Sequence, residues 1–166
     1  MAITKEKFDS TGGFSVDKTV VVDENRNAKD INTLEIRNSS FEDSSARYYI
    51  LRGLNTSILE LDLVGTQIPI ASNTLSFITG DIIGVNPQGL VYSAKIETAM
   101  ICDASGSTNV LSSMRTIIKD DIPLDQTWSI EPLGSTNLFS YSTVRAGTTN
   151  NIKWVAATKV VSIEWA

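Results

Sequence analysis

Apolar and polar residues alternate along several stretches of this chain, whereas a sustained helical period of 3.6 residues is hard to find. Within residues 92–102 the apolar parity holds Tyr92, Ala94, Ile96, Met100 and Cys102, and the other parity holds Ser93, Lys95 and Glu97. Residues 58–64 repeat the pattern, which predicts that Leu59, Leu61 and Leu63 point inward. Because successive strand residues face opposite sides, both stretches are predicted to be half-buried antiparallel strands.

Further strand candidates alternate with turn sequences at close spacing. The candidates are residues 18–23, 33–37, 48–52, 74–78, 110–118, 128–130 and 138–144, which brings the expected total to about nine or ten strands. The sequence NPQG at residues 86–89 suits a type I turn, and DASGSTN at 103–109 is rich in turn-forming residues. This pattern predicts an all-β fold, an antiparallel sandwich or barrel.

The last stretch, residues 150–166, is apolar but changes parity. Ile152, Trp154 and Ala156 are even, whereas Val161 and Ile163 are odd, as is Trp165. Two interpretations stay open: a β-bulge within residues 156–159 inverts the later side chains, or the strand is central and covered on both faces. At about 3.3 Å per residue the run would reach about 50 Å, so a bend is expected.

A terminal strand this apolar invites aggregation if it lies at a sheet edge. We therefore expect it inside a sheet, or covered by a partner subunit. Trp154 and Trp165 have opposite parity. Either one of them faces a partner, or both belong to the core of a monomer.

Composition narrows the class of protein. The 166 residues suit one main domain, and a net charge of −5 with scattered Lys and Arg argues against a nucleic-acid partner. No apolar run approaches the roughly 18 residues that span a bilayer, so no membrane insertion is expected. Residues 1–12 are interpreted as a flexible leader without a secretory signal, 13–46 as an N-terminal segment and 47–166 as a β-sandwich domain.

Few residues suggest catalysis or metal binding. The chain has no histidine, and its one cysteine, Cys102, is expected to be a small buried thiol. The adjacent carboxylate pairs Asp23 with Glu24, Glu42 with Asp43, and Asp120 with Asp121 suit solvated turns better than a glycan hydrolase site. The DASGSTN stretch lacks the further acidic ligands of a calcium loop. We therefore expect no catalytic, cofactor-binding or metal-binding residues, and a protein that is not an enzyme.

Three loops rich in Ser, Thr and Asn are the candidates for recognition, because a rigid sandwich presents its loops to partners. Their polar side chains suit hydrogen bonds to sugar hydroxyls. The expected receptor-binding residues are Thr66, Gln67, Ser72, Asn73, Ser105, Ser107, Asn109, Ser135 and Asn137.

Two parts of the chain resemble bacteriophage fibre proteins. The stretches AKIETAMICDASGSTNVLSSMRTIIKDD, TWSIEPLGSTNLFSYSTV and GTTNNIKWVAATKVVSIEW resemble the C-terminal β-sandwich domain of phage tail fibres and related virion fibres. That domain ends in a Gly-Thr-x-x-x-Ile-x-Trp-Val-Ala strand, and the matching residues here are Gly147, Thr148, Ile152, Lys153, Trp154, Val155 and Ala156.

The second resemblance is N-terminal. VVDENRNAKDINTLEI, residues 21–36, is similar to a unit of phage fibre stalks through Val21, Val22, Asp23, Arg26, Asn27, Ile31, Leu34 and Ile36, although Ala28 and Asp30 depart from the usual Leu and Asn. Together the resemblances imply a jelly-roll-like or related sandwich in a homotrimer. The expected subunit interface comprises Arg26, Asn27, Ile31, Leu34, Ile36 and Trp165.

The expected function is that of a phage virion protein, tail-fibre-like or head-fibre-like, made in the host cytoplasm and displaying its sandwich for host attachment or for capsid or tail decoration. Other virion proteins and a host surface glycan are the expected partners. The alternatives are a stand-alone carbohydrate-binding β-sandwich module and, with less support, a glycan hydrolase.

Overall fold

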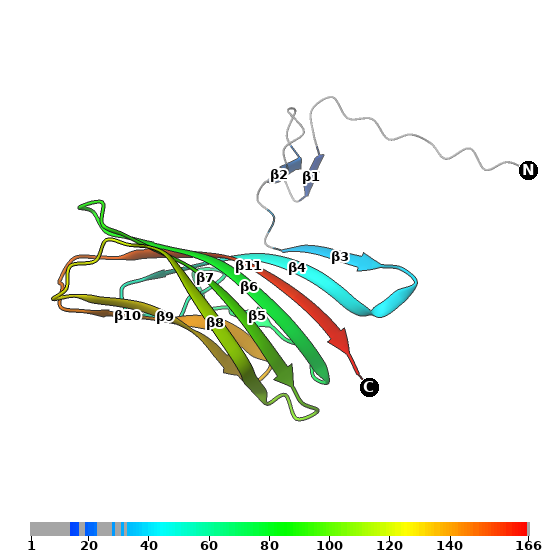
Figure 1. The fold of residues 1–166 in the computed structure, drawn as a ribbon. Helices are drawn as coiled ribbons and strands as arrows, with labels where there is room; N and C mark the ends of the chain where they lie inside the picture. The colour runs from blue at the N-terminus through cyan, green and yellow to red at the C-terminus, as the bar shows by residue number, and fades with distance from the viewer. Residues whose placement is uncertain (1–13, 17–18, 23–27, 29–30, 32, 166) are drawn as a thin grey trace, which may run out of the picture. The chain divides into compact units, whose positions relative to one another are not determined.

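The computed structural model describes residues 14–16, 19–22, 28, 31 and 33–165 (Figure 1). Throughout these residues the regular elements are strands, no helix occurs, and every strand pair is antiparallel. The predicted all-β antiparallel fold is therefore confirmed. The chain divides into two compact units, Met1–Asn32 and Thr33–Ala166. In the first unit, β1 (Phe14–Val16) pairs with β2 (Thr19–Val22).

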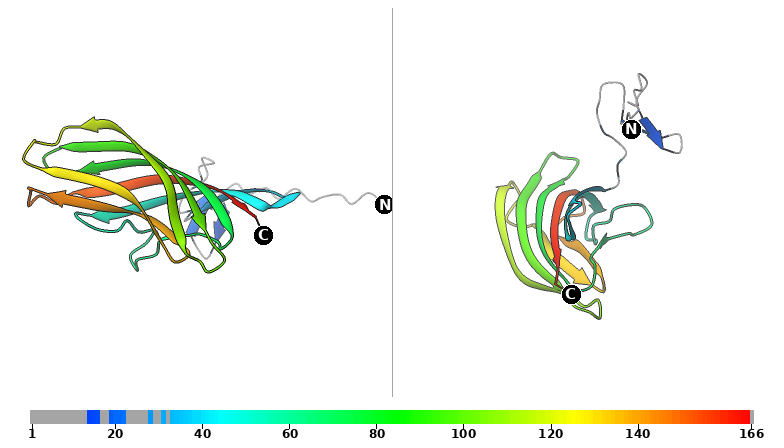
Figure 2. Two further views of the ribbon diagram at one scale, coloured as in Figure 1. Left: turned by 60° about the horizontal axis from the view of Figure 1, so that its bottom comes forward. Right: turned by 90° about the vertical axis from the view of Figure 1, so that its right-hand side faces the viewer.

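The second unit contains two sheets that form separate layers, as Figure 2 shows. The larger sheet has six strands in the order β3 (Leu34–Asn38), β4 (Phe41–Leu54), β11 (Lys153–Glu164), β6 (Thr74–Val85), β7 (Val91–Cys102) and β8 (Thr108–Asp120). The smaller sheet has three, in the order β5 (Ile68–Pro69), β10 (Leu138–Ala146) and β9 (Thr127–Ser135). The arrangement is sandwich-like, with strands β3 and early β4 drawn from the segment that was expected to precede the sandwich.

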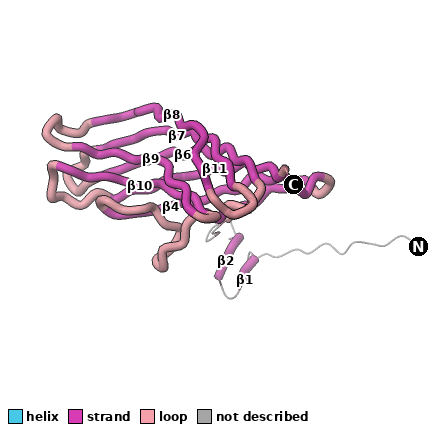
Figure 3. Tube along the Cα trace, turned by 90° about the horizontal axis from the view of Figure 1, so that it is seen from below, coloured by secondary structure: helices cyan, strands magenta, loops and turns pink. Residues whose placement is uncertain are grey.

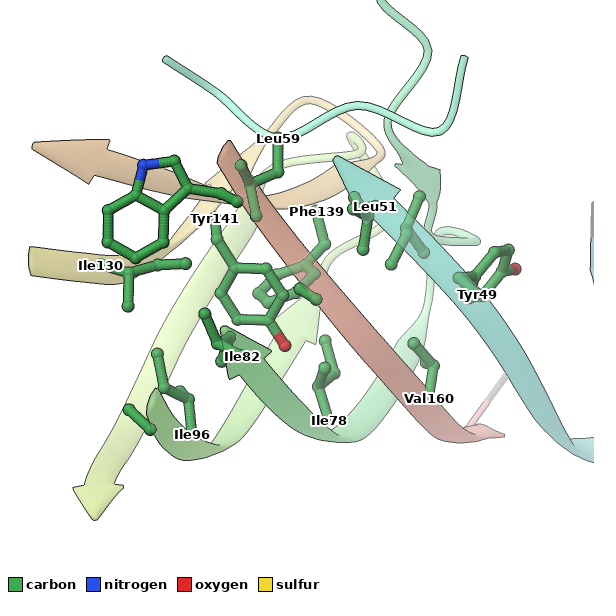
Figure 4. Close-up of a cluster of buried hydrophobic side chains, with 14 of the residues drawn as sticks. Tyr49, Leu51, Leu59, Ile78, Ile82, Ile96, Ile130, Phe139, Tyr141 and Val160 are labelled. Carbon is green, nitrogen blue, oxygen red and sulfur yellow. The ribbon is translucent and has the colours of Figure 1, made fainter. Parts of the chain in front are cut away.

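The core lies between the two layers. Strands of the large sheet contribute alternate residues such as Leu51, Ile78 and Ile96, and the small sheet contributes Ile130 and Phe139, all of them 0% exposed (Figure 4). Cys102 ends β7 as a buried free thiol, as predicted. Burying a large apolar side chain stabilises the fold by about 1.5–3 kcal/mol, so this alternation is what fixes the register of each strand.

Aromatic side chains close one part of this core. The Trp154 ring makes edge contacts with Tyr92, at 5.9 Å between ring centroids, and with Trp128, at 6.2 Å. The Trp154 indole N–H donates to the carbonyl oxygen of Asn55 at 3.0 Å. Both sheets and the chain after β4 are thus tied to one indole.

The C-terminal strand β11 is central, between β4 and β6, and pairs with both of them without a register shift. Of the two interpretations left open, the bulge within residues 156–159 is therefore wrong and the central strand is confirmed. Even residues such as Ala156 and Val160 are buried between the sheets, whereas Val161 and Ile163 lie on the other face. The parity of the apolar residues changes because part of that second face is itself apolar.

The predicted strand at residues 58–64 is also wrong. Leu59 is buried, but the segment makes only isolated bridges, Arg52 to Glu60 and Ile58 to Ser142, and Leu63 is fully exposed. The reason is local: Asp62 accepts hydrogen bonds from the backbone N–H groups of Val64 and Thr66, which turns the chain. Figure 3 draws the chain after β4 mainly as loop.

Candidate functional site

The face of the six-stranded sheet that points away from the small sheet is apolar and uncovered. We call it the outer face. Eight of its large apolar side chains, from β4, β6 and β11, are between 36% and 55% exposed: Tyr48, Ile50, Leu75, Phe77, Ile83, Val85, Val161 and Ile163. Isolated exposed apolar residues are ordinary, but a contiguous set of this kind marks an interaction surface.

A shallow depression of about 390 Å³ lies at one end of the outer face. Its apolar lining comes from Leu75, Phe77, Ala99, Val161 and Ile163. The register places Val161 opposite Phe77 and Ile163 opposite Leu75, so β6 and β11 form its floor together. Its chemistry suits an aliphatic or aromatic side chain of a partner.

A polar belt crosses the middle of the outer face. Its charged residues are Asp81, Lys95, Glu97 and Lys159, two of each sign. Lys95 pairs with Glu97 at 3.2 Å, and the Lys159 ammonium lies 5.7 Å from the centre of the Tyr48 ring. The belt is therefore neutral although the chain carries a net charge of −5. Toward the end of the face away from the depression, Arg52 of β4 and Lys153 of β11 also point outward, so the case for burial rests on the apolar side chains.

At one end of the sandwich the structure brings together the three predicted recognition loops. The Asn137 amide donates to the Ser72 hydroxyl at 3.1 Å and to the Ile70 carbonyl at 3.0 Å. The backbone N–H of Asn137 donates to the Gly106 carbonyl at 2.8 Å. Both Asn137 and Asn73 have a positive φ, of 55° and 57°, which asparagine tolerates better than most residues.

Asp103 organises the middle loop. Its carboxylate accepts hydrogen bonds from the Ser105 N–H and hydroxyl and from the Ser107 N–H, at 2.6–3.0 Å. These bonds, from the Ser105 hydroxyl first and the Ser107 backbone next, lower the pKa of Asp103. The loop is thus fixed, and Ser105 and Ser107 remain exposed, as do Asn109 and Ser135.

Thr66 and Gln67 do not take part in this cluster's hydrogen bonds. Thr66 is exposed beside the turn at Asp62, and Gln67 is half-buried just before β5. Ser105, Ser107, Asn109 and Ser135 are thus the predicted receptor-binding residues that are both exposed and on the converging loops. The receptor-binding role of all nine residues stays a prediction.

The described part of the predicted subunit interface is exposed in the single chain. Ile31 is 46%, Leu34 51%, Ile36 57% and Trp165 49% exposed. The backbone N–H of Trp165 donates to the carbonyl oxygen of Asn73 at 3.1 Å. Arg26 and Asn27, and with them most of the stalk-like unit, lie outside the described residues. Their role at an interface stays a prediction.

A polar groove lies where the inner face of the large sheet runs past the small one. It is lined by Arg37, Glu42, Asp43, Arg47 and Glu164, among others. Glu35 pairs with Arg37 at 2.9 Å and with Arg47 at 3.3 Å. In the second acidic pair, Asp121 forms an ion pair with Lys119 at 3.0 Å, and Asp120 accepts a hydrogen bond from the N–H of Ile122. Asp23 and Glu24, the third pair, lie outside the described residues.

Sequence reasoning offered two apolar faces as one interpretation of residues 150–166, but it did not identify the outer face as a whole. Two sequence patterns indicated it. On β6, Leu75 and Phe77 occupy the positions that alternate with buried residues such as Ile78, and along β11 the apolar residues change parity. Both patterns mean that a strand carries apolar residues on two faces.

No protein-family model matches the chain, and no curated protein matches it. Among solved structures, the chain is similar to the crystal structure of a tailspike protein, gp49 from Acinetobacter baumannii bacteriophage Fri1, a capsular polysaccharide depolymerase. The TM-score is 0.43 and the sequence identity is 17%. The match covers 86% of this chain but 22% of the tailspike chain, so this chain spans less than a quarter of that protein's length.

This finding corrects one expectation. From the missing histidine and the solvated carboxylates, we expected a protein that is not an enzyme. The tailspike to which it is similar is a depolymerase, and the assignment of a non-enzymatic protein is withdrawn.

Within the described residues, no cluster of three or more His, Cys, Asp or Glu is placed to hold a metal ion, and no helix is long and apolar enough to cross a membrane.

Proposed function

We propose that this chain is a phage virion protein, tail-fibre-like or head-fibre-like, that assembles as a homotrimer. The observation that carries the proposal is the outer face, where eight large apolar side chains from three adjacent strands are uncovered in the single chain. When subunits meet, this apolar area is removed from water, and each Å² that is buried stabilises the assembly by about 25 cal/mol. The resemblance to phage fibre sandwiches supports the proposal that the trimer is part of a phage virion.

The sandwich would be displayed for host attachment or for decoration of the capsid or tail. The loop cluster supports attachment, because its backbone is fixed by Asn137 and Asp103 while Ser105, Ser107, Asn109 and Ser135 keep exposed polar groups. Hydroxyl and amide groups of this kind suit the hydroxyls of a host surface glycan. Preorganised loops bind with a smaller entropic cost than loops that must first become ordered.

A second candidate is a carbohydrate-binding β-sandwich module that works alone. The same loop cluster favours it, since a monomer can present those loops equally well. The two candidates differ in what they require of the outer face: an oligomer buries it, and a lone module leaves it in water.

Size-exclusion chromatography with light scattering tests the assembly, and immunogold labelling of phage particles with an antibody against this chain tests its location. We expect a particle of three chains and labelled virions. A single chain at all protein concentrations would favour the lone module, and unlabelled virions would contradict a virion protein.

A further inference from the structure

The loop after β4 presents two aliphatic side chains that no other part of the sandwich covers. Leu63 is 104% and Val64 87% exposed, and among the described residues no other two adjacent large apolar residues are as exposed. In the right-hand view of Figure 2 this teal loop projects from the sandwich. We call Leu63 and Val64 the apolar knob. Burying both side chains against a partner would remove their apolar area from water, at about 25 cal/mol for each Å².

The loop that carries the knob is closed by its own hydrogen bonds. Asp62 Oδ1 accepts the N–H of Val64 at 3.0 Å and of Thr66 at 3.1 Å, and the N–H of Leu61 donates to the Thr66 carbonyl at 2.7 Å. Hydrogen bonds from the Thr66 side chain first, then from the backbone, lower the pKa of Asp62 and keep it ionised near neutral pH. These bonds fix the backbone of the loop that carries the knob.

The same chain contains an apolar depression to receive it. The depression on the outer face has a volume of about 390 Å³, with Phe77, Val161 and Ile163 among its lining residues. An apolar cavity of about 150 Å³ accepts a molecule as large as benzene, so the depression has room for the Leu63 and Val64 side chains.

Resting on the proposed homotrimer, we propose that the apolar knob of one copy inserts into the outer-face depression of the next copy. Knob and depression belong to different surfaces of one chain, so the contact is heterologous. Three identical heterologous contacts close a ring, as a trimer requires.

Charge complementarity selects a second copy as the occupant. Asp62 beside the knob is negative, and Lys159 is the next outward residue of β11 before Val161 at the depression. The Lys159 ammonium lies 5.7 Å from the centre of the Tyr48 ring, at the outer surface. Glu97, which lies in the same cross-strand row as Lys159, is already paired with Lys95 at 3.2 Å.

Disulfide trapping tests the contact, because Cys102 is the single cysteine of the sequence and is buried. Val64→Cys and Val161→Cys proteins are co-expressed, so that trimers contain both, and oxidised. We expect a cross-linked pair on a non-reducing gel from the mixture and none from either variant alone. Leu124→Cys is the matched control in place of Val64→Cys, since Leu124 is an equally exposed loop leucine, at 108%, and should give no cross-link with Val161→Cys.

A double variant tests the energetics. Leu63→Asp with Val64→Asp should weaken assembly by at least about tenfold in chain concentration and keep the circular dichroism spectrum of the wild type. Its dissociated chains should unfold at the midpoint of dissociated wild-type chains, because neither side chain belongs to the core. Leu124→Asp should leave assembly unchanged. A wild-type trimer with no cross-link and no loss of assembly in the double variant overturns this inference and leaves the proposed function standing. A wild-type chain that is monomeric at every concentration overturns both.

Discussion

The Trp154 ring packs directly against the backbone of Gly84 on the neighbouring strand β6. A Cβ atom placed on Gly84 would lie 2.5 Å from Cζ3 of the Trp154 indole, far inside normal contact distance. The indole has no room to retreat, because Tyr92 and Trp128 pack against it with their rings. Glycine is therefore required here by close approach and not by an unusual backbone angle.

Gly84→Ala should destabilise the sandwich by about 1–3 kcal/mol, the usual cost of overpacking a core. In a strand without such a contact, the same change would stabilise by roughly 0.5–1 kcal/mol, so the sign of the effect is informative. Urea unfolding measures it, with Thr79→Ala, an outward change on the same strand, as the control. An increase in the unfolding free energy of Gly84→Ala would contradict the packing of Trp154.

Tyr141 should make stability fall in strong base. Its side chain is fully buried, its hydroxyl lies 3.5 Å from that of Thr158, and burial raises the pKa of Tyr141 to about 12. A tyrosine of the unfolded chain titrates near pH 10, so only the unfolded state loses this proton between about pH 10 and 12. The contribution is fully present below pH 10 and is lost as pH rises toward 12, by about 2–3 kcal/mol.

Tyr141→Phe should flatten that part of the profile of unfolding free energy against pH. Tyr49 and Tyr92, whose pKa values burial also raises, leave a residual slope of the same sign. Tyr48→Phe, a change on the outer face, serves as the control. An unchanged profile in Tyr141→Phe would mean that the hydroxyl is hydrated in the folded state.

Asn137→Ala should loosen the loop cluster. The change removes hydrogen bonds to Ile70 and Ser72 and places alanine at a φ of 55°, so we expect a loss of about 1–3 kcal/mol. Hydrogen exchange of the amides in residues 70–73 and 103–109 should accelerate. Ser135→Ala, an exposed neighbour, should change stability by less than about 0.5 kcal/mol. Equal effects of the two changes would contradict the role given to Asn137.

The all-β class followed from period-two alternation because burial on one face leaves a direct mark in the sequence. Tyr92, Ile96 and Cys102 are buried as that pattern predicts. The placement of β11 between β4 and β6 could not be derived, since strand order depends on pairings between residues far apart in the chain. The apolar character of residues 58–64 misled for a related reason: Asp62 forms a turn whose hydrogen bonds outweigh the alternation.

The candidate site divides in the same way. Ser, Thr and Asn in the turns predicted the exposed loops, but their convergence on Asn137 depends on the tertiary fold. The outer face was hidden because an apolar residue on a second face of a strand resembles a core residue until the layers are known. Leu75 and Phe77 show this most clearly.

Sedimentation equilibrium of the wild type beside Phe77→Asp tests most directly whether the outer face is buried between copies. Phe77 is 50% exposed in the single chain and lines the depression, so a buried carboxylate there would oppose assembly without disturbing the core. We predict three chains per particle for the wild type and one for Phe77→Asp. Dissociated wild-type chains and Phe77→Asp chains should unfold at the same midpoint. A wild type that sediments as one chain, or a Phe77→Asp protein that remains trimeric, would contradict the account.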